Sequence, residues 1–235
     1  MRSTVRTMLV VSFGLLLGLD YSVADAANTC NSVTIKLSVA SGPGLTAKQS
    51  EEQQGSLPSY NTAIKAINNA NNDVMILLAK KLRTMGMNAD GAGYLALKSQ
   101  DPRFIDALGR QQKDIDQRML DLIARYGLPT AEKVGPHGTM SAVMVMANTL
   151  DPDNAAKFAE LWKSGCAKGV LPCAAYALIE DNALLVQAGI QRFGTSSGVP
   201  FAQGSSLKEV NEERAKIGLS PLSQACVESI TKPQS

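Results

Sequence analysis

From residue 60 onward, apolar residues recur at three- and four-residue steps, which is the spacing of one face of an α-helix. The pattern predicts helices over about residues 60–85, 101–108, 115–126, 139–150, 151–165, 172–189 and 206–218. Short connections between consecutive helices favour antiparallel neighbours around one core. We therefore expect an all-α fold, a single helical domain of about six or seven helices.

Capping signals mark three of the predicted helix starts: Asp101-Pro102, Asp151-Pro152 and the Ser206–Glu209 capping box. The run from Thr139 to Leu150 is apolar nearly all round. A helix without a polar face must be surrounded by other elements. We expect this helix at the centre of the fold, with its methionines as core filling.

The segment before the helices has a different pattern. Apolar and polar residues alternate from Val33 to Val39, which predicts one short strand or extended segment. Residues 48–59 are polar and predict a linker. A lone strand needs a partner, and one hypothesis is that it pairs with the edge of another chain in an assembly or stress factor of the cell envelope.

The N-terminus has the three parts of a signal peptide. They are a positive start with Arg2 and Arg6, an uncharged apolar run from Met8 to Leu19, and small residues in Ala24-Asp25-Ala26. The apolar run is too short to span a bilayer comfortably. We expect cleavage after Ala26, with Ala24 as the runner-up; an uncleaved anchor and lipidation at Cys30 are the alternatives.

This predicts an exported protein, periplasmic or secreted, with no stable membrane insertion after signal cleavage. The chain then divides into a signal peptide (1–26), an extended or linker segment (27–58), N-terminal helices (59–109) and a larger helical region (110–235).

Four cysteines favour disulfides in an exported chain: Cys30, Cys166, Cys173 and Cys226. Cys166 and Cys173 flank a predicted helix–turn–helix corner, where a bridge would join consecutive helices. Cys30 with Cys226 would then close a very long loop. Other pairings, and free thiols, remain open at this point.

Composition narrows the classes of partner and cofactor. Hydrophobic residues are 45% and charged residues 19% of 235, and the formal net charge is +2. A charge this small predicts no nucleic-acid partner, which would need a clustered basic face. We expect no metal and no cofactor, since His137 is the only histidine that could serve as a ligand. His137 could act as a general base, but the simpler interpretation is an exposed residue without a catalytic role.

Three motifs in the second half of the chain stand in a fixed order. They are Tyr126-Gly127-Leu128-Pro129 with Val134-Gly135, then Gln191-Arg192-Phe193-Gly194-Thr195, then Arg214 with Gly218-Leu219-Ser220-Pro221-Leu222. They resemble the Tyr-Gly-x-Pro…Val-Gly, Gln-x-Tyr-Gly-Thr and Arg-x-x-x-Gly-Leu-x-Pro-Leu motifs of an uncharacterised bacterial domain-of-unknown-function family. The resemblance covers about residues 110–230 and implies a helical fold without an established activity.

The chain departs from that family pattern at two places. The family commonly has Gln-His-Ala-Asp where this chain has Ala147-Asn148-Thr149-Leu150, and often Asp-Arg where it has Asp181-Asn182. The histidine and the arginine are the residues of the family pattern best suited to catalysis. A histidine-dependent activity of the family would therefore be absent here.

The motif residues are also the candidates for ligand contact. A ligand could bind where aromatic, amide and hydroxyl side chains meet at one pocket entrance, and the motifs supply four of these: Tyr126, Gln191, Phe193 and Thr195. The simpler interpretation is that the neighbouring glycines supply a helix cap and a sharp turn.

Asp181 is a carboxyl group in an otherwise apolar helix, so it must pair or take up a proton. Arg214 and Arg125 are the candidate partners, and a structural ion pair is the expected outcome. We expect a non-enzymatic binding or interaction protein of the cell envelope, whose partner is an unknown envelope protein or a small ligand. The alternative is a hydrolase with a carboxylate-centred site around Asp181.

Overall fold

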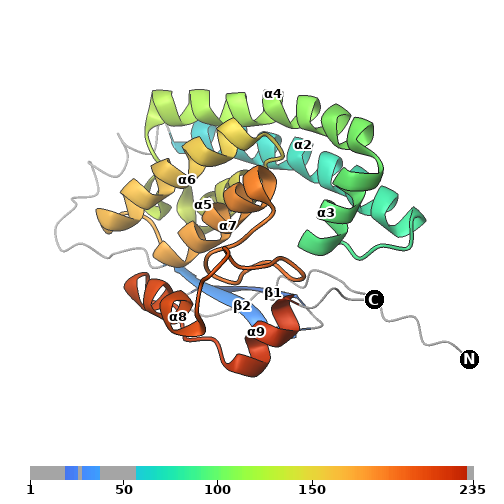
Figure 1. Cartoon of the computed structure of the whole chain (residues 1–235). Coiled ribbons are helices and arrows are strands. Elements are labelled where there is room, and N and C mark those ends of the chain that lie inside the picture. The colour runs from blue at the N-terminus through green and yellow to red at the C-terminus, as the bar shows by residue number, and fades with distance from the viewer. Residues whose placement is uncertain (1–18, 26–27, 38–56, 232–235) are drawn as a thin grey trace, which may run out of the picture.

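The computed structural model describes residues 19–25, 28–37 and 57–231, and the described part is mostly helical (Figure 1). The helices are α2 (Leu57–Thr84), α3 (Gly91–Gln100), α4 (Pro102–Tyr126), α5 (Ala131–Ala147), α6 (Pro152–Ala167), α7 (Cys173–Ala188), α8 (Leu207–Lys216) and α9 (Gln224–Thr231). Two strands precede them, β1 (Leu19–Asp25) and β2 (Asn28–Leu37). The expected all-α single domain is confirmed, with eight helices in the described residues rather than six or seven.

Two of the predicted helices, 101–108 and 115–126, form one helix in the structure. The sequence suggested separate helices on either side of Gly109, but α4 runs unbroken from Pro102 to Tyr126. A single glycine costs a helix only about 1 kcal/mol, and the apolar face of α4 continues through it. The Asp101 side chain accepts a hydrogen bond from the Phe104 amide, as an N-cap followed by proline predicts.

Helix α3 was not among the predicted helices, and two glycines, Gly91 and Gly93, lie in its first turn. The structure shows why glycine is needed there. A Cβ at Gly91 would lie 2.3 Å from the Val199 side chain, and one at Gly93 would lie 1.9 Å from the Asn88 carbonyl oxygen. Asp90 caps the helix by accepting a hydrogen bond from the Gly93 amide at 2.8 Å. The glycines therefore permit close packing rather than ending the helix.

Helices α5 and α7 form the centre of the molecule, and α2, α4 and α6 pack around them (Figure 1). Most residues of the expected central helix are buried, among them Ala142, Val143, Val145 and Met146, all with no exposed area. The second part of α5 begins after a kink at Gly135, whose φ of 70° is left-handed. Glycine adopts that conformation without the penalty that a Cβ brings.

The C-terminal helices form a smaller unit below this core. Val210 of α8, Leu222 and Ile230 of α9 make a separate apolar cluster. The loop that joins α7 to α8, residues 189–206, lies between the two cores and is tied to α9 by a hydrogen bond from the Gly198 amide to the Ile230 carbonyl oxygen at 2.6 Å. The position of α8 therefore depends on how this loop is held.

The strand expected from the alternating pattern is present as β2. It pairs antiparallel with β1, which places Val23 opposite Val33 and Leu19 opposite Leu37. The sequence offered no partner for this strand, because residues 19–25 fall inside the predicted signal peptide. Most of the predicted linker over residues 48–59 lies outside the described residues.

The predicted bridge between Cys166 and Cys173 is confirmed, with the two Cα atoms 4.8 Å apart. It joins the end of α6 to the start of α7. Cys226 on α9 is also disulfide-bonded. Its predicted partner, Cys30, belongs to β2, and β2 packs beside α9. The Cys30 side chain is not among those that the structure describes, so this pairing stays a prediction.

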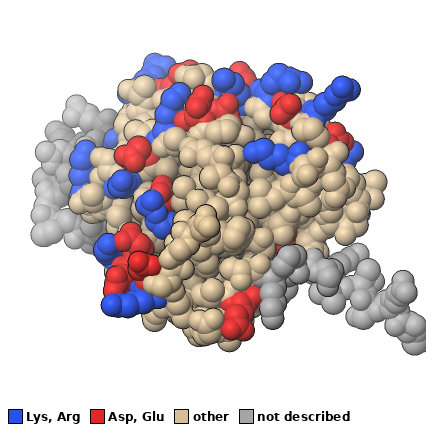
Figure 2. All heavy atoms as spheres, viewed as in Figure 1, with Lys and Arg blue, Asp and Glu red and all other residues tan. Residues whose placement is uncertain are grey.

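Within the described part of the chain, no helix combines the length and the apolarity needed to cross a bilayer. Basic and acidic side chains are interspersed over much of the face in Figure 2, while its centre carries few charges.

Candidate functional site

Asp181 on α7 is completely buried and holds the 189–206 loop. One carboxylate oxygen accepts hydrogen bonds from the amides of Arg192 and Phe193 at 2.7 and 2.9 Å. The other accepts from the amide and the hydroxyl of Thr195 at 2.9 and 2.8 Å. Both oxygens are thus fully occupied by groups of the loop.

The electrostatics of Asp181 follow from this arrangement. Burial raises the pKa of its carboxyl group, and the amide N–H groups of Phe193, Thr195 and Arg192 oppose that rise. The three amides can only donate, so the ionised form suits them best. A buried carboxylate with this many donors is a structural clamp that satisfies otherwise orphaned loop amides.

Arg214 on α8 holds the same loop from the other side. Its Nη1 donates to the Phe193 carbonyl oxygen, and its Nε donates to the Ser220 carbonyl oxygen at 2.7 Å. Asp181 and Arg214 are therefore linked through the peptide groups of Phe193, whereas the sequence suggested a direct ion pair. Arg125, the other expected partner, lies over the Tyr126 ring at 5.2 Å instead.

Gln191 closes the loop on itself. Its Nε2 donates to the Val199 carbonyl oxygen at 2.6 Å, and its Oε1 accepts from the Ser196 amide at 2.9 Å. The Phe193 ring packs edge-on against Tyr176 with centroids 5.7 Å apart. The motif residues Gln191, Phe193 and Thr195 are thus brought together, but as an internal scaffold.

Tyr126 does not join them. It stacks on Tyr60 of α2, with ring centroids 4.9 Å apart, and its carbonyl oxygen accepts a hydrogen bond from Lys133 in the first turn of α5. Asp181 lies near the opposite end of α5, since the neighbouring Asn182 donates to the Thr149 carbonyl oxygen just beyond that helix. The single pocket entrance that the sequence suggested is not formed.

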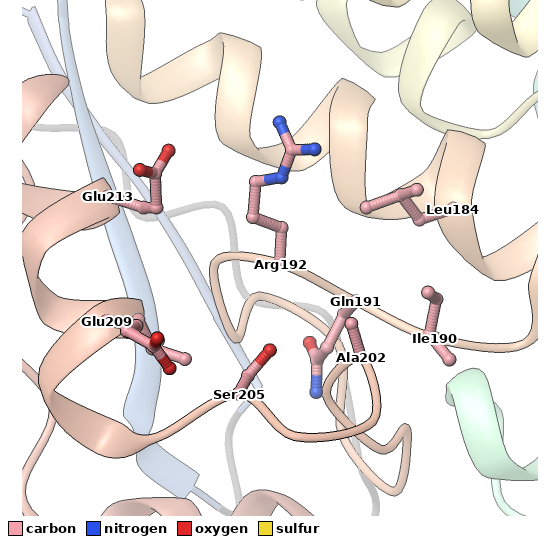
Figure 3. Close-up of a pocket in the computed structure, with 9 residues that line it drawn as sticks. Leu184, Ile190, Gln191, Arg192, Ala202, Ser205, Glu209 and Glu213 are labelled. Carbon is pink, nitrogen blue, oxygen red and sulfur yellow. The ribbon is translucent and has the colours of Figure 1, made fainter.

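A groove opens beside the clamped loop, and we call it the α8 groove (Figure 3). It encloses about 180 Å³ and is lined by Leu184, Ile190, Gln191, Arg192, Ala202, Ser205, Glu209, Val210 and Glu213. In Figure 3 the two glutamates project from α8 on one side, and Leu184 and Ile190 lie on the other. The α8 wall therefore carries two carboxylates beside Val210, and the α7 and loop wall combines apolar side chains with the polar Gln191, Arg192 and Ser205.

Each charged side chain that lines this groove has a polar or charged partner elsewhere in the protein. Arg192 pairs with Glu180 of α7, with Nη1 3.0 Å from Oε1. Glu209 caps α8 by accepting from the Ser206 amide, and Glu213 pairs with Lys216. The Glu213–Lys216 pair is exposed, so it is weak and a ligand could replace it, whereas the Glu180 side chain is mostly buried.

A second buried polar cluster lies between α2, α4 and the α5–α6 corner, and the sequence analysis missed it. The Asp116 carboxylate accepts hydrogen bonds from Gln112 at 3.1 Å and from Thr149. Gln112 also donates to Asn71 at 3.1 Å, and all of these side chains are fully buried. Burial raises the pKa of Asp116 to about 6.

The signal that could have revealed this cluster is a spacing. Gln112 and Asp116 occupy positions in the same stripe as Ile105, Leu108 and Met119, where the helix period demands apolar residues. Two of the atoms in the cluster, Asn71 Nδ2 and Gln112 Oε1, have no hydrogen-bond partner. A polar layer inside an apolar interface can fix the register of two helices.

The structure gives no catalytic or metal-binding setting to the remaining candidate in the described residues, His137. His137 is exposed on α5, two residues after its kink. Among the described residues, no group of three or more histidine, cysteine or acidic side chains could hold a metal ion.

Comparison with known protein families, with curated proteins and with solved structures gives no match to this chain.

Proposed function

We propose that this protein is an exported, non-enzymatic binding protein of the cell envelope, and that it contacts its partner through the α8 groove. The observation that carries the proposal is the engagement of Asp181. Among the residues that the sequence singled out, this carboxylate is the one best suited to acid–base chemistry. All four of its hydrogen bonds come from the protein's own loop.

A clamp of this kind favours binding over catalysis. A general acid or nucleophile must reach the substrate, and Asp181 has no exposed area. Arg214, the other buried charge nearby, is held by two carbonyl oxygens. Both residues instead give the loop beside the groove a fixed shape, which lowers the entropic cost of binding.

The groove itself suggests the chemistry of the partner. At about 180 Å³ it is smaller than the roughly 300–1,000 Å³ that cofactors and drug-sized ligands occupy. Leu184, Ile190 and Val210 offer an apolar contact, and Glu209 and Glu213 offer negative charge at the rim. Arg192 also lines the groove, and its guanidinium group is paired with Glu180. With that positive charge paired, the groove fits a single side chain with an apolar stem and a positive end, presented by a partner protein.

Charge reversal on α8 tests the proposal with a matched control. Glu213 lines the groove, whereas the adjacent Glu212 is exposed and pairs with Lys208 outside it. Both substitutions, Glu213→Lys and Glu212→Lys, remove one exposed ion pair and change the charge equally. Tagged versions would be cross-linked in living cells, and the copurifying proteins identified, after fractionation shows where the protein resides.

We expect a specific envelope protein to copurify with the wild type and with Glu212→Lys. Glu213→Lys should no longer capture this protein. Unfolding temperatures of the two variants should agree within a few degrees, which excludes misfolding as the cause. Retention of the protein in the cytoplasm, or equal capture by both variants, would contradict it.

A further inference from the structure

The predicted cleavage point lies between two paired strands. β1 spans Leu19–Asp25 and β2 spans Asn28–Leu37, and the two pair antiparallel. Cleavage after Ala26 would therefore separate β1 from β2. The last part of the predicted signal peptide is thus paired with a strand that the chain would keep after cleavage.

The register of this pair is chemically matched from Leu19 to Val23, and an irregularity follows before Asp25. Tyr21 stands opposite Ile35, and Val23 opposite Val33, so apolar positions face apolar positions. Polar positions alternate with them, and Asp20 stands opposite Lys36. Matched cross-strand positions of this kind stabilise antiparallel pairs.

β2 packs beside α7 and α9, so we expect it to stay attached to the folded domain when β1 is removed. In the described residues the sheet contains only these two strands. Removing β1 leaves a row of backbone N–H and C=O groups along one edge of β2 without partners. Such an edge is a template for another strand.

We propose that the mature protein uses this edge of β2 to bind an extended strand of a partner protein, in the antiparallel register that β1 holds before cleavage. The partner strand has apolar residues at alternate positions and an acidic residue opposite Lys36. This inference rests on the proposed function, because export and signal cleavage are what free the edge. It uses backbone pairing as in other strand-addition interactions.

Charge complementarity distinguishes a partner strand from a second copy of this chain. β2 reads NTCNSVTIKL and contains no acidic residue, so a second β2 has no acidic position that could stand opposite Lys36. β1 has Asp20 at that position of the register. The edge therefore fits an acidic, alternating strand better than it fits itself.

The test uses the exported mature protein and a fluorescent peptide of residues 18–26. Intact mass first establishes where the exported chain begins, and anisotropy then measures peptide binding. We expect saturable binding that the Ser22→Pro peptide loses. Lys36→Glu should weaken binding up to about fivefold, and the Asp20→Lys peptide should restore it. Lys65→Glu on the exposed face of α2 is the matched control.

Several outcomes would overturn the inference. An exported chain that retains residues 19–25 would mean that the edge is already covered. Absence of saturable binding, or equal effects of Lys36→Glu and Lys65→Glu, would mean that the edge takes no strand in this register, and would leave the α8 groove proposal standing. A self-associated protein that excludes the peptide would make a second copy the occupant. Absence of export would instead contradict the proposed function itself.

Discussion

At the scale of single residues, Asp181 shows why a buried carboxyl group need not be a reactive one. The sequence correctly required that it pair or become protonated, because an apolar helix cannot bury a bare charge. The partners could not be predicted, since they are loop amides eleven to fourteen positions away rather than a charged side chain. Backbone donors have no signature in the sequence.

Asp181→Ala should destabilise the fold strongly, because it leaves buried amides of the loop without acceptors. We expect a loss of roughly 3–5 kcal/mol in the free energy of unfolding, measured by urea denaturation. Asp121→Ala, an exposed change of the same kind on α4, should cost within about 0.5 kcal/mol. Similar losses for the two variants would argue against the clamp.

Asp116 should make stability depend on pH. Its pKa is raised from 3.8 to about 6 by burial, so the folded chain binds this proton more tightly than the unfolded chain. Its contribution is therefore most favourable below about pH 4 and is lost as the pH rises to about 6. The neighbouring groups are Gln112, Thr149, Asn154 and the carboxylate of Asp151.

Comparison with Asp116→Asn isolates this effect from other titrating groups. From about pH 7 down to about pH 4, the wild type should gain about 2–3 kcal/mol of unfolding free energy relative to the variant. Urea denaturation at several pH values measures the difference. A difference that stays constant with pH would show that Asp116 does not titrate in this range.

At the scale of elements, the helical period carried most of the prediction. The helices over residues 57–84, 152–167, 173–188 and 207–216 lie close to where apolar spacing and caps placed them. The errors came from glycines. The helices predicted over 101–108 and 115–126 are one helix that passes through Gly109, and no helix was predicted around Gly91 and Gly93, which let α3 pack closely. Sequence alone does not distinguish a glycine that ends a helix from one that admits a neighbour.

The disulfide between α6 and α7 allows a prediction at this scale. Replacing both Cys166 and Cys173 by alanine should lower the free energy of unfolding by about 2–3 kcal/mol, the value for a short loop closed in the unfolded chain. Urea denaturation checks it, and an unchanged midpoint would contradict it.

The second pairing is checked separately. Peptide mapping of the unreduced, exported protein should recover a peptide from β2 joined through Cys30 to a peptide containing Cys226. Recovery of Cys226 joined to any other cysteine would show that the prediction is wrong.

At the scale of the whole molecule, two cores meet at the 189–206 loop. The larger core surrounds α5 and α7, and the smaller one joins α8 to α9. Asp181 ties the loop to the first and Arg214 ties it to the second, so the α8 groove lies at the junction. The all-α class was predictable because it depends on local periodicity. The groove was not, because it depends on how distant segments pack.

On our proposal, the α8 groove contacts a partner outside the cytoplasm. The most direct measurement is site-specific photo-cross-linking in living cells from Ala202 in the groove, with exposed Gln117 of α4 as the control position. We expect one dominant cross-linked envelope protein from Ala202 and none from Gln117. Equal, diffuse cross-linking from both positions, or cross-links only to cytoplasmic proteins, would contradict it.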